Sequence, residues 1–184
     1  MHGRSLARFA GFTLTEMLIA AALVAAAAAV AVPMLSAPSP SRVQLAGTEL
    51  VQALRFARSE AQRTRVPHGV RIDAATERAQ VFRLDMSTAP ATRLFTVRHP
   101  LHHGLYVLDF PTDPATKGVT IATSTLTFAG ACTETRDVIF DARGWPLCSN
   151  PSTVELTSGT VDLALGGVTR RVTVAGATGR VVLQ

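Results

Sequence analysis

The sequence predicts an α+β protein, with a long hydrophobic helix at the N-terminus followed by a mostly antiparallel, β-rich globular head. Alanine, leucine and valine are concentrated between Leu14 and Leu35, which predicts the helix. Short stretches with alternating apolar residues follow one another after Pro67, which predicts the strands. At 184 residues the chain has room for one ordinary domain and one long helix, so we expect a single core.

The first two segments are a short basic leader, residues 1–11, and an apolar helix, residues 12–35. The nineteen residues 17–35 are apolar and would rise about 28 Å as a helix, against a hydrocarbon core of about 30 Å. Arg4 and Arg8 precede the apolar run, and no comparable cluster follows it directly. The positive-inside bias therefore predicts a single membrane pass with a cytoplasmic N-terminus and a periplasmic head.

Glu16 is an acidic residue at the start of this apolar run. A carboxylate near lipid costs a few kcal/mol unless a cation meets it. Cleavage between Gly11 and Phe12 would create an amine on Phe12, four residues away, and a neighbouring subunit could present the same cation in an assembly. The alternative is that Glu16 only interacts with the helix dipole at the membrane interface. The residue by itself leaves both interpretations open.

Residues 36–41 are rich in serine and proline and predict an interruption or linker. They leave open whether the helical segments on either side are continuous. The head is expected to span residues 42–184 and to begin with an amphipathic helix over 42–65, whose apolar stripe packs on a sheet. The apolar positions at helical spacing are Val43, Leu50, Leu54, Ala57 and Ala61.

After this helix, period-two stretches separated by turn residues predict a mostly antiparallel sheet, or two such sheets. The predicted strands lie at residues 70–72, 81–84, 94–97, 105–108, 126–128, 138–140, 161–165, 172–174 and 181–183.

The segment 11–16, Gly-Phe-Thr-Leu-Thr-Glu, followed by an apolar helix, resembles the class III signal of type IV pilins and pseudopilins. The resemblance implies cleavage after Gly11 by a prepilin peptidase and N-methylation of Phe12. It also implies that Glu16 registers the subunit against its neighbour's amino terminus during assembly. A plain signal anchor is the alternative, and it predicts an intact leader.

Three further stretches are similar to the GspH/FimT family: residues 50–65, residues 139–146 (Ile-Phe-Asp-Ala-Arg-Gly-Trp-Pro) and residues 178–181 (Thr-Gly-Arg-Val). The resemblance implies a minor pilin or minor pseudopilin near a filament tip, in a type IV pilus or a type II secretion system. Its implied partners are other pilin subunits, the prepilin peptidase and the bacterial inner membrane. The sequence does not decide between the two machines.

DNA binding in natural transformation is an alternative function, because some minor pilins of this family take up DNA through a C-terminal Gly-Arg-x-Arg motif. Residues 179–182 are Gly-Arg-Val-Val, so the match stops at Arg180, with Arg170 and Arg171 as candidate compensating contacts. Non-specific DNA affinity needs several phosphate contacts acting together. Residues 170–184 also lack an aromatic residue on which a base could stack. The filament role is therefore favoured.

The sequence offers little support for a metal site or an enzyme. His99, His102 and His103 match no metal-ligand spacing, so a surface loop is expected there, with no metal and no cofactor. The chain has no nucleophile elbow, His-Glu-x-x-His motif, P-loop or Rossmann glycine pattern, which argues against catalysis. Cys132 and Cys148 are expected to form a disulfide in an oxidising periplasm.

Overall fold

The computed structural model of the chain describes the backbone of residues 13–36 and 40–184, and the side chains of residues 13–25 and 40–184. The chain divides into two compact units, one up to Ala37 and the other from Pro38 onward. The predicted leader, with its cleavage residues Gly11 and Phe12, lies outside the described residues.

The first unit contains one described helix, α1, which spans Leu14–Ser36. Alanine and leucine dominate its sequence, and both have high helix propensity. The side chains of residues 13–25 are exposed. Over the described part of the chain, no helix meets the length and hydropathy needed to cross a membrane.

The second unit, the head, begins with helix α2, Pro40–Thr64. Proline is well tolerated at the first helical position, because its missing N–H would have no partner there and its φ is already helical. The predicted interruption at 36–41 is therefore narrower in the structure: Ser36 belongs to α1, and Pro40 and Ser41 belong to α2. Residues 37–39 lie outside the described residues.

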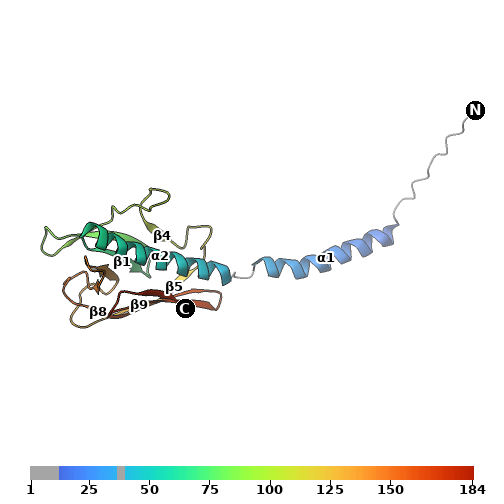
Figure 1. Ribbon diagram of the computed structural model, residues 1–184. Coiled ribbons are helices and arrows are strands. Elements are labelled where there is room, and N and C mark those ends of the chain that lie inside the picture. The colour runs from blue at the N-terminus through green and yellow to red at the C-terminus, as the bar shows by residue number, and fades with distance from the viewer. Residues whose placement is uncertain (1–12, 37–39) are drawn as a thin grey trace, which may run out of the picture. The chain divides into compact units, whose positions relative to one another are not determined.

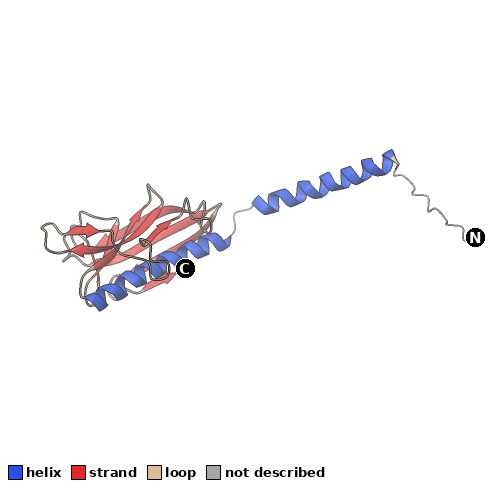
Figure 2. Ribbon diagram, turned by 90° about the horizontal axis from the view of Figure 1, so that it is seen from above, coloured by secondary structure: helices blue, strands red, loops and turns tan. Residues whose placement is uncertain are grey.

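Helix α2 is amphipathic, and its apolar face packs against the sheets of the head (Figures 1 and 2). At Gly47 the helix comes so close to β10 that an added Cβ would lie 2.6 Å from Leu183 Cδ1. The buried residues of α2 include all five positions that the helical spacing predicted. The full set of buried residues is Val43, Ala46, Gly47, Leu50, Val51, Ala53, Leu54, Ala57 and Ala61.

Within residues 40–184 the strands form two antiparallel sheets (Figure 2). The larger sheet has the order β3-β2-β1-β6-β7, with β4 also paired to β2, and the smaller sheet has the order β10-β9-β8-β5. The α+β class with antiparallel sheets is confirmed. The strands are β1 His68–Asp73, β2 Arg78–Asp85, β3 Thr92–Leu94, β4 Val107–Asp109, β5 Thr120–Phe128, β6 Asp137–Phe140, β7 Pro146–Leu147, β8 Leu156–Leu165, β9 Val168–Ala175 and β10 Val181–Leu183.

Each predicted strand overlaps an observed one, and β7 was not predicted. The main core lies between α2 and the sheets, where side chains such as Leu50, Leu54 and Phe140 are fully buried. A smaller cluster of Phe82, Leu84 and Ile139 covers the other face of the larger sheet. Strands β2 and β6 of the larger sheet therefore face an apolar layer on each side.

Candidate functional site

Thr13 and Glu16 form a reciprocal capping box at the start of α1. The backbone N–H of Glu16 donates to Thr13 Oγ1 at 3.3 Å, and the backbone N–H of Thr13 donates to Glu16 Oε2 at 3.1 Å. The Thr13 hydroxyl donates to the same Oε2 at 3.0 Å. Two amide donors that the helix cannot satisfy are thereby satisfied. Oε1 of Glu16 receives no hydrogen bond from the described residues.

The three candidate DNA-contacting arginines have different surroundings. Arg171 forms a bidentate pair with Asp162, with Nε–Oδ1 at 2.7 Å and Nη2–Oδ2 at 2.8 Å. Hydrogen bonding from Arg171 holds the pKa of Asp162 below its usual value. Arg170 Nε donates to Gln44 Oε1 of α2 at 2.9 Å. Arg180 is exposed directly before β10 and lines a cavity.

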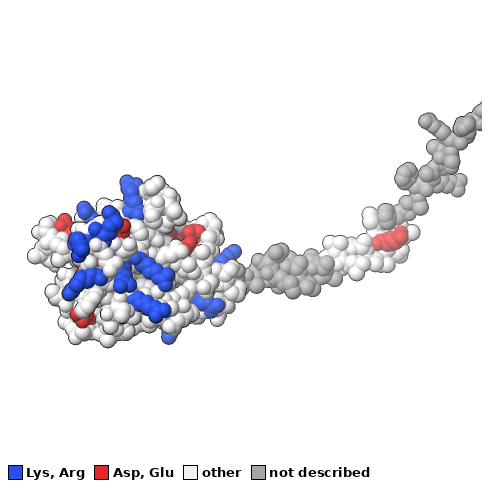
Figure 3. Space-filling view, viewed as in Figure 1, with Lys and Arg blue, Asp and Glu red and all other residues white. Residues whose placement is uncertain are grey.

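This cavity, which we call the arginine cleft, lies between α2 and β10 and has a volume of about 400 Å³. Arg55 Nη2 donates to the carbonyl of Val181 at 2.9 Å, and Arg58 Nη1 donates to the carbonyl of Gly179 at 3.4 Å. Figure 3 shows arginine and lysine side chains gathered on the face of the head along which α2 runs. The lining residues are Arg55, Arg58, Ser59, Gln62, Arg180 and Val181.

In residues 13–36 and 40–184, no ion pair neutralises Arg55, Arg58 or Arg180. Helix α2 also contains Arg63, but that residue forms an ion pair with Glu60, with Nη2 and Oε2 2.6 Å apart. The cleft therefore concentrates positive charge that the described residues leave uncompensated. The sequence did not indicate this cluster, because Arg55 and Arg180 are far apart along the chain.

A tight turn after β6 approaches the cleft. Gly144 and Gly179 both have positive φ, and an added Cβ on Gly179 would lie 2.5 Å from the Gly144 carbonyl oxygen. An added Cβ on Gly144 would lie 2.8 Å from Arg58 Nε. Only glycine adopts such a conformation in so little space without strain. The turn from β6 and the turn before β10 therefore meet beside the α2 arginines.

The same turn carries an exposed aromatic residue. Asp141 Oδ1 accepts the backbone N–H groups of Arg143 and Trp145, each at 2.9 Å, which fixes the turn. The Arg143 guanidinium lies 4.8 Å from the centroid of the Trp145 ring, within cation–π range. Trp145 also lines a cavity with Gly176, in the turn between β9 and β10. Trp145 is therefore an exposed aromatic side chain beside the turn that precedes β10.

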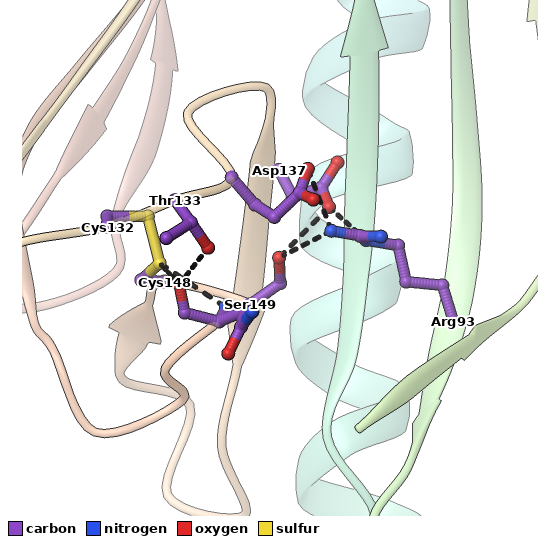
Figure 4. The surroundings of a disulfide bond; sticks show 8 residues. Arg93, Cys132, Thr133, Asp137, Cys148 and Ser149 are labelled. Atoms are coloured by element: carbon purple, nitrogen blue, oxygen red, sulfur yellow. Dashed lines mark hydrogen bonds and ion pairs between the residues drawn. A yellow bond between two sulfur atoms is a disulfide. The ribbon is translucent and has the colours of Figure 1, made fainter. Parts of the chain in front are cut away.

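Cys132 and Cys148 form the predicted disulfide, with their Cα atoms 5.9 Å apart. Beside it, Asp137 is fully buried and accepts hydrogen bonds from Arg93 Nε and from Ser149 Oγ (Figure 4). Burial raises the pKa of Asp137, and the Arg93 charge opposes this shift. Because the arginine comes from β3 and the aspartate from β6, the cluster joins distant parts of the larger sheet.

The histidines lie in the loop between β3 and β4. The His99 and His102 rings stack with centroids 4.1 Å apart, and the His99 ring also meets Tyr106 at 4.4 Å. The Nδ1 atoms accept backbone N–H groups from Leu101 and Gly104. In the described part of the chain, no group of three or more histidine, cysteine or acidic side chains is arranged to hold a metal ion.

Comparison with solved structures shows the fold. Two structures of the minor pseudopilin EpsH from the type II secretion system of Vibrio cholerae align with 17% sequence identity. One has a TM-score of 0.50 and covers 78% of this chain and 96% of that chain. The other has a TM-score of 0.51 and covers 77% and 92%. The type IV minor pilin FimU of Pseudomonas aeruginosa aligns at 19% identity over 77% of this chain and 87% of that chain, with a TM-score of 0.45.

No curated protein sequence matches the chain significantly. A family model does match: the family described as type II transport protein GspH aligns with residues 46–178. The match begins inside α2 and extends through β9, so it includes most of the head. Since the matched residues are well over half of the sequence, this chain belongs to the GspH family.

Proposed function

We propose that this chain is a minor pilin or minor pseudopilin, a non-enzymatic structural subunit near the tip of a type IV pilus or a type II secretion pseudopilus. The observation that carries the proposal is the combination of a GspH-family head with the Gly-Phe-x-x-x-Glu signal of residues 11–16. The head supplies contacts to other subunits, and the N-terminal segment supplies anchoring and assembly.

In this proposal residues 12–35 hold the chain in the bacterial inner membrane before assembly, with the head in the periplasm. The support comes from the length and composition of that segment and from Arg4 and Arg8 ahead of it. The disulfide between Cys132 and Cys148 agrees with an oxidising compartment. The exposed apolar side chains of residues 13–25 agree with an environment of lipid or neighbouring subunits.

Processing after Gly11 by the prepilin peptidase would give Phe12 a charged, N-methylated amine. In the assembled filament we assign Glu16 the role of meeting this amine on a neighbouring subunit. The capping box leaves Oε1 of Glu16 without a donor among the described residues, so one carboxylate oxygen is available for that cation. A charge-assisted hydrogen bond of this kind would offset the cost of the carboxylate near lipid.

The test is intact-mass and N-terminal analysis of the protein from membranes, in cells with and without the prepilin peptidase. We expect a mature chain that begins at methylated Phe12, and a full-length chain when the peptidase is absent. Gly11→Val should block processing, whereas Gly3→Val is the matched control and should not. A chain that still begins at Met1 with the peptidase present, or one cut after Leu35, would contradict the proposal.

DNA binding in natural transformation is less well supported as a function. Of its three candidate residues, Arg171 is neutralised by Asp162 and Arg170 is bonded to Gln44. Arg180 has Arg55 and Arg58 beside it in the cleft, but one compact cavity does not supply the extended track of phosphate contacts that non-specific DNA affinity needs. This alternative predicts a salt-dependent shift of DNA by the purified chain, which the filament role does not require.

A further inference from the structure

We propose that the arginine cleft between α2 and β10 binds a carboxylate presented by a protein partner. This inference rests on the proposed filament role for the kind of partner, namely another subunit with an exposed acidic side chain. The binding chemistry itself follows from Arg55, Arg58 and Arg180.

The cleft is organised before any ligand arrives. Each of the two helix arginines gives one N–H group to a backbone carbonyl near β10, Arg55 to Val181 and Arg58 to Gly179. These bonds hold the planar guanidinium groups in place and leave their other donors for a ligand. Fixing long side chains in advance lowers the conformational entropy that binding would otherwise cost.

One donor in the cleft lacks a partner. Arg58 Nε is buried and makes no hydrogen bond in the described structure. A buried N–H group that has lost its water and found no acceptor is costly, especially on a charged group. Its surroundings are tight, since the backbone of Gly144 passes close by. A bound anion would offset part of this cost through its charge on the guanidinium group, without a bond to the enclosed Nε.

The charges also favour an anion. Several other arginines of the head are paired with acids, as Arg63 is with Glu60, Arg143 with Asp141 and Arg171 with Asp162. The three cleft arginines have no such match among the described residues. Like charges grouped in one cavity repel each other. The attraction of each arginine to a bound anion would offset that repulsion.

The size of the cleft decides between classes of anion. The guanidinium fork fits carboxylates and phosphates alike. A cavity of about 400 Å³ accommodates one acidic side chain, whereas a nucleic acid needs a track of phosphate contacts. Arg170 and Arg171, the residues that would extend such a track onto β9, are already bonded to Gln44 and Asp162. A protein carboxylate is therefore the better fit.

The test uses the full-length chain in a non-ionic detergent and a fluorescein-labelled hexaglutamate peptide, with anisotropy measured at an ionic strength of about 50 mM. A hexaglutamine peptide serves as the uncharged probe, and a twenty-nucleotide thymidine strand and inorganic phosphate serve as competing anions. We expect the acidic peptide to bind, the uncharged peptide not to bind, and Arg180→Gln to weaken peptide binding about tenfold.

Arg170→Gln is the matched control, because it removes the same charge from the neighbouring strand, and it should change binding less than about twofold. Arg55→Gln gives a second, independent variant if Arg180→Gln lowers the melting temperature. Equal weakening by Arg170→Gln and Arg180→Gln would overturn the proposal in favour of diffuse surface charge. Tighter binding of the thymidine strand than of the peptide, lost in Arg180→Gln, would overturn it in favour of nucleic acid.

The peptide measurement requires neither cleavage after Gly11 nor assembly into a filament. Failure of the cleft to bind the peptide would therefore leave the proposed function intact. Conversely, a chain that is never processed would refute the filament role while the peptide result stood by itself.

Discussion

The two long helices of this chain are similar in length, with 23 residues in α1 and 25 in α2, but they differ in how far their apolar side chains are buried. In α2 the apolar residues lie on one face and are buried by the sheets of the head. In α1 the large apolar side chains described are exposed, including Leu14 at 78% and Leu23 at 66%.

The difference follows from the sequence pattern. A helix with one apolar stripe can complete a core in its own domain, whereas a helix that is apolar all round needs an apolar environment on every side. The sheets of the head bury the apolar face of α2, so the stability of the head should depend on contacts within residues 40–184. In the proposed function, lipid or other subunits cover the apolar surface of α1. The predictions below test this division.

The largest effect is expected from Leu50→Ala in α2. Leu50 is fully buried in the main core, so the substitution should lower the free energy of unfolding of the head by about 2–5 kcal/mol. Urea unfolding of the full chain in detergent, followed by near-UV circular dichroism of the head, would measure the loss. The matched control is Leu18→Ala in α1, where the same atoms are removed from an exposed position.

For Leu18→Ala we expect a change in head stability below about 0.5 kcal/mol. If Leu18→Ala destabilised the head as much as Leu50→Ala, the division between the two helices would be wrong.

An intermediate effect is expected from removing the disulfide. The link between Cys132 and Cys148 closes a loop with a sequence separation of 16. In the chain-entropy model its loss costs about 3 kcal/mol. Unfolding of the Cys132→Ala/Cys148→Ala variant should show this loss in the head, while the helix content of α1 stays unchanged. Dithiothreitol should lower the free energy of unfolding of the wild-type head to a similar extent and leave that of the double variant unchanged. Equal stability with and without the disulfide would contradict the prediction.

The smallest effect is expected at Arg171, on the surface of the head. Arg171 holds the pKa of Asp162 below its usual value, so the ionised pair stabilises the head above the unfolded-state pKa of about 3.9. This contribution is lost as the pH falls through the lower, folded-state pKa. The stability difference between wild type and Arg171→Gln should therefore be small at neutral pH and shrink below about pH 4.

The control for this effect is Arg170→Gln, because Arg170 bonds to the uncharged Gln44. Its stability difference from wild type should show no comparable decrease below pH 4. The measurement is urea unfolding across pH 2–7 on all three proteins. Parallel pH profiles for the two variants would refute the assignment of the effect to the Asp162 pair.

Much of the head could be predicted from residue patterns, because its elements have clear periods. The helical spacing of Leu50, Leu54 and Ala57 indicated the buried face of α2, and alternation indicated most strands. Strand β7 was missed because two residues, Pro146 and Leu147, show no period. Proline at the start of α2 was interpreted as an interruption, since proline ends a helix in most other positions.

The candidate site was less predictable. Arg180 was singled out from its motif, but its neighbours in the cleft were not, and Arg171 was a candidate contact although Asp162 neutralises it. Residues that meet only through folding leave no local signal. The burial of Asp137 between Arg93 and Ser149 is a similar case, because the two partners lie on either side of it in the chain.

The sequence by itself determined the division into an apolar N-terminal segment and an α+β head, since periodicity and composition act locally. It also indicated the Gly11–Glu16 signal and the cysteine pair. Only the tertiary structure decided that Arg55 and Arg58 meet Arg180, and that the turn carrying Trp145 meets the turn before β10. The physical reason is that antiparallel pairing and the docking of α2 bring together segments more than a hundred residues apart. The small size of Gly144 and Gly179 lets the two turns come into close contact beside them.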